Sequence, residues 1–430
     1  MILTRWTALL AGLSLVIVLV ARSWWAVLAC IGTLVVLVVL DLILCPSPRQ
    51  VRVRRDGDTS LRLGDAGVSV VTLTNTGHRT LRAVVRNAWT PSAGATGGIA
   101  RISLPARQRR RLTTGLLPTR RGDRRAGPVV IRALGPLRLA GRQAGHDAPW
   151  TVRVLPPFHS RKHLPSRLAR LRELDGQSVV LQRGQGTEFD SLREYVPGDD
   201  VRSIDWRGTA RSSTVMVRTW RPERDRHVLV VLDSGRTCAG RVDDQPRLDH
   251  AMDAALLLSV LASRAGDRVD LLIADRTVRA KVQRTSASDV LARFVNAMAP
   301  VDASLVESDH HLIATEVSQM VTQRSLIVFL TGMDRASLTE GLLPVLGPVL
   351  RKHRIVVASV SDPRIPELLA ARSDPADAYA AAAAEADIER RSQTAFALRQ
   401  SGITVVQAPP ARFAPEVADR YIALKRAGQL

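Results

Sequence analysis

The chain has 430 residues, of which 61 are Lys or Arg and 40 are Asp or Glu, so its formal net charge is +21. A hydrophobic content of 46% argues against a mainly disordered chain, and three cysteines argue against a disulfide framework. Residues 49–226 hold 35 basic and 15 acidic side chains, whereas residues 227–430 hold 24 of each sign. This concentration predicts an anionic partner for the basic region: nucleic acid, an anionic membrane surface or an acidic protein.

Two apolar runs open the chain, at residues 6–21 and 23–40, with Arg22 alone between them. We expect residues 1–48 to form a hairpin of two transmembrane helices, although the first run reaches only about 24 Å of a roughly 30 Å apolar core. Arg5 precedes the first run and a basic segment from Arg49 follows the second, so the positive-inside rule places both ends in the cytoplasm. The expected localisation is the cell membrane, multi-pass, with a cytoplasmic soluble region. A cleaved signal peptide is the alternative for the first run.

Short alternating apolar runs follow, and they predict a small antiparallel β-sandwich over residues 49–155. Runs such as residues 68–74, 81–85 and 129–132 are separated by turn signals at Asn75 and at Gly135-Pro136. The arginine-rich segments at residues 107–111 and 120–125 belong to its polar faces, which either face solvent or contact lipid headgroups.

The rest of the chain divides into a connection, residues 156–226, and an α/β domain, residues 227–430. The connection contains a basic stretch, residues 161–172, that predicts a short amphipathic helix, and then a dense polar tract. From residue 227, near-continuous apolar strands alternate with amphipathic helices, which predicts a doubly wound sheet covered on both faces. The expected strands are residues 228–232, 269–273, 278–282, 326–330, 355–360 and 403–406, and the expected helices are 248–264, 287–298, 311–323, 338–350, 375–399 and 415–426.

Polar residues that follow two of these strands are the candidates for a site, because open α/β sheets bind ligands beyond the carboxyl ends of their strands. Asp233 and Thr237 follow the first strand, and Asp334 follows the fourth. Their carboxylate and hydroxyl oxygens are ligand types that Mg²⁺ or Mn²⁺ accepts.

This arrangement resembles the von Willebrand factor A domain, whose metal-ion-dependent adhesion site carries Asp-x-Ser-x-Ser after the first strand. The resemblance implies Asp233, Thr237, Ser308 and Asp334 as metal ligands, with Gly235 in place of the first serine, so the site is degenerate. The alternative is that Asp233 and Thr237 only cap the turn and helix that follow.

An enzyme alternative also starts from Asp233, because haloacid dehalogenase-like phosphatases place a nucleophilic aspartate after this strand in the pattern Asp-x-Asp-x-Thr. Gly235 removes the second aspartate, which is the general acid of that reaction. The chain also lacks a Gly-x-x-x-x-Gly-Lys phosphate loop, so nucleotide chemistry would have to come from a partner.

The most specific motif is the polar tract, residues 186–211, GTEFDSLREYVPGDDVRSIDWRGTAR. It resembles the signature of the bacterial domain-of-unknown-function family fifty-eight: Glu-Phe-x-x-Leu-Arg-x-Tyr, then Gly-Asp-Asp, then Arg-x-Ile-Asp-Trp. The signature residues implied as an interaction tract are Glu188, Phe189, Arg193, Tyr195, Asp199, Asp200, Arg202, Asp205 and Trp206. The resemblance implies a membrane-anchored protein with a von Willebrand factor A-like domain that works with a MoxR-type AAA+ ATPase in chaperone-like maturation or envelope stress.

Three interpretations of the tract stay open. Its arginines and carboxylates could pair to clamp an ordered connection onto the α/β domain, or its Trp, Tyr and Arg could form a docking surface for another protein. A catalytic pair at Asp199-Asp200 is the least favoured, because neighbouring side chains in an extended segment point apart.

The sequence therefore predicts a non-enzymatic, membrane-anchored interaction protein. Its expected partners are the ATPase, an unidentified client protein and anionic lipids. Nucleic acid is disfavoured because recognisable nucleic-acid-binding motifs are missing from the basic region. The two alternatives to this adaptor are an envelope scaffold without an ATPase link and, less favoured, a phosphohydrolase that uses Asp233.

Overall fold

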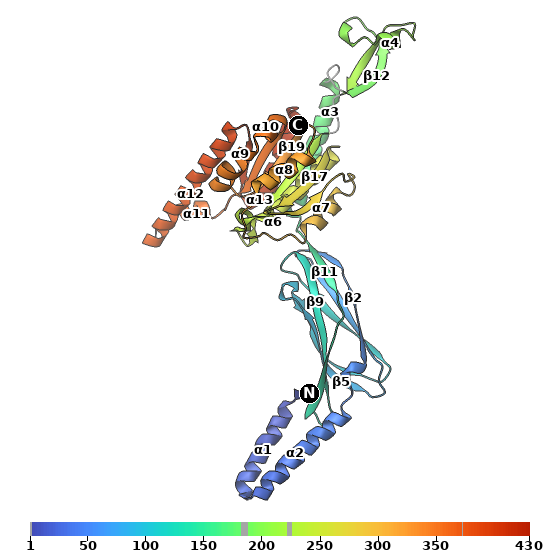
Figure 1. Cartoon of the computed structure of the whole chain (residues 1–430), viewed down its shortest axis with the longest axis vertical. Coiled ribbons are helices and arrows are strands. Elements are labelled where there is room, and N and C mark those ends of the chain that lie inside the picture. The colour runs from blue at the N-terminus through green and yellow to red at the C-terminus, as the bar shows by residue number, and fades with distance from the viewer. Residues whose placement is uncertain (1, 182–187, 222–225, 372) are drawn as a thin grey trace. The chain divides into compact units, whose positions relative to one another are not determined.

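The computed structural model describes residues 2–181, 188–221, 226–371 and 373–430. The chain divides into two compact units, Met1–Leu155 and Pro156–Leu430 (Figure 1).

Unit 1 begins with two consecutive helices that pack against each other, α1 (Arg5–Ala21) and α2 (Trp24–Leu44). The Thr4 hydroxyl caps α1 by accepting the Trp6 N–H, and Arg22 ends it in the left-handed conformation at φ 44°. Among the described helices, α2 with the residues that follow it to Gln50 is long and apolar enough to cross a membrane, while α1 is apolar but shorter. The membrane-helix prediction is therefore confirmed for one candidate helix, and the two-span hairpin stays a prediction.

Two sheets packed face to face follow the helices. The smaller sheet has the strand order β2-β4-β8-β6. The larger sheet has the path β1-β10-β9-β11-β3, and β5 also pairs with β9 and carries β7 on its other side. Their inner faces share a core that includes Val71 and Leu73 from one sheet and Val85 and Ile131 from the other. The strands are β1 (Ile2–Leu3), β2 (Val51–Gly57), β3 (Ser60–Arg62), β4 (Gly67–Asn75), β5 (Leu81–Trp89), β6 (Ala95–Thr96), β7 (Ile99–Leu104), β8 (Arg109–Leu116), β9 (Gly122–Leu134), β10 (Ala140–His146) and β11 (Thr151–Leu155), with short helical turns η1 (Pro48–Gln50) and η2 (Pro91–Ala93).

The sandwich departs from the antiparallel prediction at one edge, where β3 pairs with β11 in parallel. Residues 63–66 turn the chain out of the larger sheet, so β4 joins the smaller sheet rather than pairing with β3. An edge strand of three residues gives no alternating apolar pattern from which its direction can be read.

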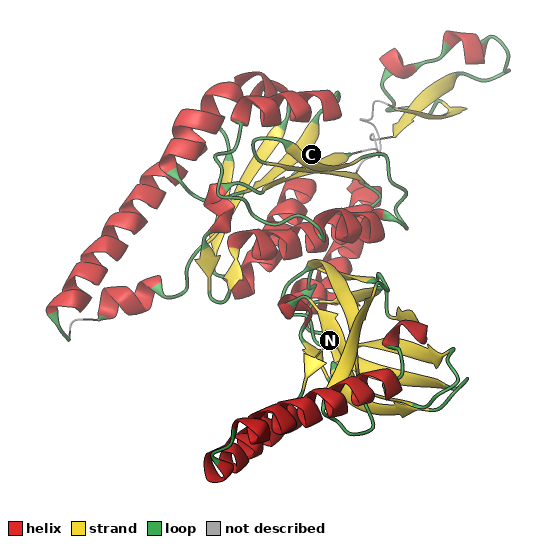
Figure 2. Cartoon of the chain, turned by 60° about the horizontal axis from the view of Figure 1, so that its bottom comes forward, coloured by secondary structure: helices red, strands yellow, loops and turns green. Residues whose placement is uncertain are grey.

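Unit 2 contains a six-stranded sheet of order β18-β17-β14-β19-β20-β21, parallel except for β18 (Figure 2). Helices α6, α7 and α13 cover one face, and α8, η5 and α12 cover the other, so the predicted α/β architecture is confirmed. The strands are β14 (His227–Asp233), β17 (Arg268–Ala274), β18 (Val278–Val282), β19 (Ser325–Leu330), β20 (Arg354–Val360) and β21 (Thr404–Ala408), and β15 (Arg241–Val242) and β16 (Gln245–Pro246) form a separate small hairpin. The helices are α5 (Arg236–Ala239), α6 (Arg247–Arg264), α7 (Val290–Met298), α8 (His310–Met320), η5 (Ala336–Leu342), α9 (Leu343–Val345), α10 (Gly347–Lys352), α11 (Ile365–Ala370), α12 (Pro375–Gln400) and α13 (Pro410–Arg426).

The connection that precedes this domain is largely helical. The turn η3 (His159–His163) leads into α3 (Leu164–Leu181), which packs against α6 and α13. Leu171 is buried, and Arg167 donates from Nη2 to the Asp419 carboxylate at 2.7 Å. The basic stretch predicted as a helix is thus fixed to the α/β domain by an ion pair and an apolar contact.

The signature tract forms a small hairpin module. Strands β12 (Glu188–Glu194) and β13 (Met216–Arg221) pair antiparallel, and the loop between them holds η4 (Val201–Ser203) and α4 (Trp206–Thr209). Asp200 caps η4 and Asp205 caps α4 through their carboxylates, which explains why these positions carry short acidic side chains.

Candidate functional site

The first candidate site lies at the carboxyl ends of β14 and β19. These neighbouring parallel strands flank the point where the strand order reverses direction, which is where doubly wound sheets open a crevice for ligands. Asp233 is the last residue of β14, and Thr331 directly follows β19.

Asp233 is almost fully buried, and its carboxylate accepts four hydrogen bonds. Oδ1 accepts from Ser308 Oγ at 2.5 Å and from the Gly235 N–H at 2.8 Å. Oδ2 accepts from Thr237 Oγ1 at 2.9 Å and from Thr331 Oγ1 at 2.6 Å. An ionised carboxylate has about four acceptor positions, so these donors satisfy Asp233 and tie three loops together.

A second carboxylate, Asp275, lies beside the first and follows the end of β17. It is fully buried and accepts from Ser304 Oγ at 2.7 Å, Arg279 Nε at 2.8 Å and Ser234 Oγ at 3.3 Å. Burial opposes its ionisation, but hydrogen bonds from Ser304, the Thr277 N–H and Arg279 outweigh that effect and lower the pKa of Asp275 to about 2. We call Asp233, Asp275 and the hydroxyls of Thr237, Ser304, Ser308 and Thr331 the strand-end cluster.

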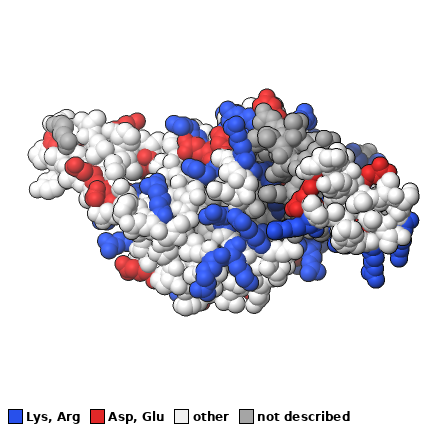
Figure 3. All heavy atoms as spheres, turned by 90° about the horizontal axis from the view of Figure 1, so that it is seen from above, with Lys and Arg blue, Asp and Glu red and all other residues white. Residues whose placement is uncertain are grey.

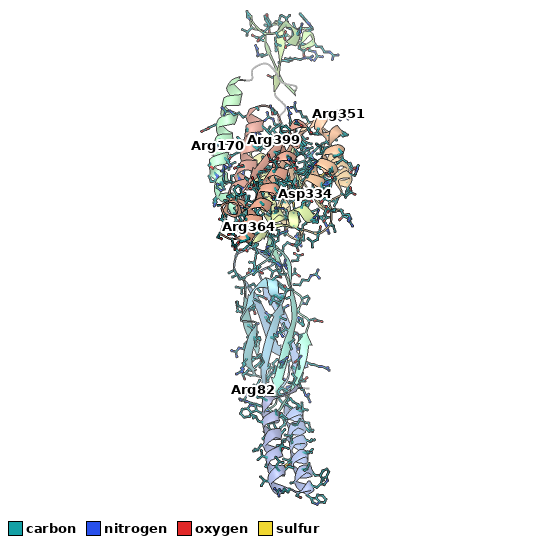
Figure 4. All side chains as sticks on the ribbon, turned by 90° about the vertical axis from the view of Figure 1, so that its left-hand side faces the viewer. Arg82, Arg170, Asp334, Arg351, Arg364 and Arg399 are labelled. Atoms are coloured by element: carbon teal, nitrogen blue, oxygen red, sulfur yellow. The ribbon has the colours of Figure 1, made fainter. Side chains whose placement is uncertain are left out.

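The structure brings together three of the four residues expected as metal ligands: Asp233, Thr237 and Ser308. The carboxylate of Asp334, which Figure 4 labels, accepts the Ser337 N–H at 3.0 Å at the start of η5, and Thr331 donates to Asp233 instead. Thr331 begins the segment Thr331-Gly-Met-Asp334 that the sequence places after the fourth strand, whereas Ser304 and Asp275 escaped the sequence analysis. Asp275 stands one residue past an apolar strand, so the rule that selected Asp233 also selects Asp275 when it is applied to that strand.

The side chains as placed do not fit a divalent cation. Protein donors fill the acceptor positions of Asp233. The space left by the missing side chain of Gly235 is occupied by Ser308, because a Cβ added at Gly235 would lie 2.2 Å from Ser308 Oγ. Within the described ranges there is no group of three or more His, Cys, Asp or Glu side chains that could hold a metal ion. The expected Mg²⁺ or Mn²⁺ site stays a prediction that this geometry disfavours.

The same contacts bear on phosphoester hydrolysis through Asp233. A nucleophilic carboxylate needs a free oxygen directed at the phosphorus. Each oxygen of Asp233 already accepts two hydrogen bonds, so neither oxygen is free for such an attack in this arrangement. The strand-end cluster is therefore built to hold three loops in place. One of these loops presents Leu305, whose side chain is 82% exposed.

The second candidate site is the hairpin module, where arginines and carboxylates pair with each other. Arg193 donates to Asp199 at 2.5 Å and Arg218 to Asp205 at 2.9 Å, and these hydrogen bonds lower the pKa of both carboxyl groups. Asp200 accepts the Arg202 N–H at 3.0 Å. Arginine–carboxylate pairing thus folds the tract onto itself, and both members of the Asp199-Asp200 pair already have partners.

The apolar side chains of the module behave differently, because several large ones face solvent. Trp206 is 69% exposed, Val201 63% and Val196 55%, while the Tyr195 N–H donates to the Val215 carbonyl within the hairpin. Glu188 and Phe189 belong to β12, but their side chains lie outside the described part of the chain. The module therefore offers tryptophan and valine at its surface, while two of its arginines, Arg193 and Arg218, pair with its own carboxylates.

Comparison with known proteins gives relatives of undetermined function. The uncharacterized protein Rv1480 of Mycobacterium tuberculosis is 27% identical over 198 residues, covering 45% of this chain and 61% of the relative. The uncharacterized protein YeaD of Bacillus subtilis is 25% identical over 146 residues, covering 34% of this chain and 35% of the relative. The matches thus span about three fifths of the mycobacterial relative and a third of the Bacillus relative.

Two of the solved structures that match the chain resemble it weakly. The RO (RSR) protein of Deinococcus radiodurans matches with a TM-score of 0.25 and 14% identity, covering 64% of this chain and 50% of that one. The CARDB domain of the PF1109 protein from Pyrococcus furiosus matches with a TM-score of 0.19 and 16% identity, covering 26% of this chain and 90% of that one. Residues 191–399, which hold most of the signature tract and the whole strand-end cluster, match the family described as "Protein of unknown function DUF58".

Proposed function

We propose that this protein is a non-enzymatic, membrane-anchored adaptor that works with a MoxR-type AAA+ ATPase in chaperone-like maturation or envelope stress. The observation that carries the proposal is the surface of the hairpin module, where Trp206 and Val201 are exposed on a loop that is held by the ion pairs Arg193–Asp199 and Arg218–Asp205. Tryptophan and arginine dominate the binding energy of protein interfaces, so such a surface favours docking. The signature resemblance supports the ATPase as the partner.

Membrane anchoring is supported by the N-terminal helices. Helix α2 is long and apolar enough to cross a bilayer, and the large apolar side chains of both helices are mostly exposed, as in Leu19 and Val36. In the proposed arrangement α1 and α2 span a bacterial cell membrane as a hairpin, and Trp6 lies at one interface while Trp24 and Trp25 lie at the other. Arg5 and Arg49 then place the soluble region in the cytoplasm.

The α/β domain is proposed as a von Willebrand factor A-like module that binds a client or partner at its strand ends. Its strand order, with an antiparallel strand at one edge, supports this assignment. The strand-end cluster holds the loop of exposed Leu305, and Arg236 pairs with Glu307 across two of the loops at 2.7 Å. An exposed apolar side chain in a loop that also carries an ion pair suits a protein partner.

The adaptor proposal is tested by purifying the full chain from native membranes and quantifying the AAA+ ATPase that accompanies it. The expected result is that Trp206→Ala reduces the recovered ATPase at least tenfold, as for a central interface residue. Tyr379→Ala is the matched control, because Tyr379 is an aromatic residue of α12 that is 80% exposed. Equal ATPase recovery with both variants, or its absence from the wild type, would favour a scaffold without an ATPase link.

A further inference from the structure

Asp41 fixes the end of α2 to the sandwich. Its side chain is fully buried, and its carboxylate accepts the N–H groups of Leu137, Leu139 and Ala140 at 2.8 Å each. Gly135 approaches so closely that a Cβ added there would lie 2.2 Å from Asp41 Oδ1. Three charge-assisted hydrogen bonds therefore hold the turn between β9 and β10 against the helix end.

The start of α1 is fixed to the same turn. Leu3 of β1 pairs with Ala140, the Thr4 N–H donates to the Leu139 carbonyl at 3.0 Å, and the Thr7 hydroxyl donates to that carbonyl as well. Both helices thus meet the sandwich at one end. The Arg5 guanidinium lies 5.9 Å from the Trp6 ring centroid there, a pair typical of a membrane interface.

Strand register identifies which other residues share this end of the sandwich. β9 ends at Leu134 and β5 begins at Leu81, opposite the end of β7, while β2 begins at Val51 opposite Asn75, the end of β4. The Asn75 amide joins the two sheets there by donating to the Leu104 carbonyl at 3.0 Å. The turns at this end carry an arginine rim of six exposed side chains: Arg5, Arg49, Arg79, Arg82, Arg107 and Arg138.

Acidic side chains are placed at the other end. Residues 1–155 contain six aspartates and no glutamate, and Asp41 is the one buried against the helix. Asp56, Asp58, Asp65 and Asp123 lie in strands or turns at the opposite end, and Asp147 follows β10. Asp56 pairs there with Arg54 and Asp123 with Arg153, whereas within the described residues no member of the arginine rim forms an ion pair. The sandwich is thus polarised, with its unpaired positive end beside the apolar helices.

We infer that the arginine rim binds the phosphate groups of anionic lipids in the leaflet that α1 and α2 enter. The inference rests on the proposed membrane anchoring and adds the surface and ligand class. Figure 4 labels Arg82 where the sandwich meets the helix pair, so a bilayer around these helices brings its headgroups to the rim. The negative potential of an anionic leaflet acts within a Debye length of about 8 Å, so arginines at this end feel it and those at the far end do not. Figure 3 shows basic side chains on a further face of the molecule, so the positive charge of the chain is not confined to the rim.

The test reconstitutes the full chain into vesicles of equal phosphatidylcholine and phosphatidylglycerol, extracts it in mild detergent and counts the retained lipids by native mass spectrometry. We expect phosphatidylglycerol to be enriched about fivefold or more, since one well-placed cation contributes about that factor. The variant Arg49→Gln/Arg79→Gln/Arg82→Gln removes half of the rim and should lower the enrichment severalfold. The control Arg54→Gln/Arg120→Gln/Arg125→Gln removes the same charge at the opposite end and should keep the enrichment.

Equal enrichment in the two triple variants, or none in the wild type, would overturn the inference while leaving the anchor intact. Release of the chain from vesicles by alkaline carbonate would instead show that the membrane anchoring has failed, and the inference with it. If the rim variant lost binding to a short DNA duplex and kept the wild-type lipid ratio, the rim would serve nucleic acid, which also contradicts the inference.

Discussion

At the scale of single residues, the strand-end cluster depends on two buried carboxylates whose charges are satisfied by protein donors. The position of Asp233 and Thr237 was predictable, because an apolar strand that ends in Asp-x-x-x-Thr directs both side chains to one sheet edge. The roles of Asp334 and Thr331 were not predictable, because the turn after β19 decides which side chain faces Asp233. Sequence spacing does not specify that turn.

Asp275 should make stability depend on pH. Its pKa in the folded chain, about 2, lies below the ordinary value of 3.8, so its contribution is complete above about pH 4 and is lost as the pH falls toward 2. The shift corresponds to about 2 kcal/mol. The pH dependence is measured by denaturant unfolding of the wild type and of Asp275→Asn between pH 6 and pH 2. The difference between their free energies of unfolding should shrink by about 2 kcal/mol as the pH falls. A gap that does not change with pH would contradict the assignment.

Gly235→Ser restores the Asp-x-Ser-x-Thr spacing and tests whether a metal site can be regained. The new Cβ would lie 2.2 Å from Ser308 Oγ and 3.0 Å from the Val306 carbonyl, so the loop must shift. We expect a loss of about 1–3 kcal/mol in the free energy of unfolding and no gain in Mg²⁺ or Mn²⁺ affinity by calorimetry. Tight metal binding by the wild type that Asp233→Ala abolishes would contradict this account of the site.

At the scale of elements, the apolar runs of the α/β domain predicted its strands closely: the expected strand at residues 326–330 is β19 (Ser325–Leu330). Buried parallel strands are continuous apolar runs, so both their existence and their bounds show in the sequence. The hairpin of the signature tract was not predicted. β12 (Glu188–Glu194) is mostly polar and pairs with β13 as an antiparallel strand, and a polar strand of this kind is not revealed by an alternation of apolar residues.

Within the hairpin module, structural and docking residues should separate experimentally. Asp205→Ala removes the Arg218 ion pair and two N–H acceptor contacts of α4, so we expect rapid proteolysis of residues 188–221. Trp206→Ala removes an exposed ring and should leave that cleavage rate within twofold of wild type. Limited proteolysis with mapped cleavage sites measures both. Equal protection of the two variants would show that the ion pair does not hold the module.

At the scale of the whole molecule, the excess of positive charge belongs to the part of the chain that follows helices α1 and α2. Composition locates the charge at residues 49–226, and the structure of unit 1 separates it into a rim beside α1 and α2 and a partly paired opposite end. Only the three-dimensional register shows this separation, since Arg49, Arg79 and Arg138 come from three turns far apart in sequence.

Asp41 should be the residue that joins the anchor to the sandwich. Asp41→Asn keeps the shape but turns an amide group toward backbone N–H donors, so we expect a loss of about 2–4 kcal/mol in the stability of unit 1. Thermal unfolding of the detergent-solubilised chain checks this against Asp147→Asn, which changes an exposed aspartate. Equal unfolding temperatures for the two variants would refute this role.

The central claim is that the hairpin module docks an AAA+ ATPase, and site-specific photo-crosslinking in native membranes tests it most directly. A benzophenone amino acid in place of Trp206 should yield an adduct with a MoxR-type ATPase, identified by mass spectrometry. The same probe in place of exposed Tyr379 on α12 should yield none. Adducts from position 206 that contain no AAA+ ATPase, or identical adducts from both positions, would contradict the account.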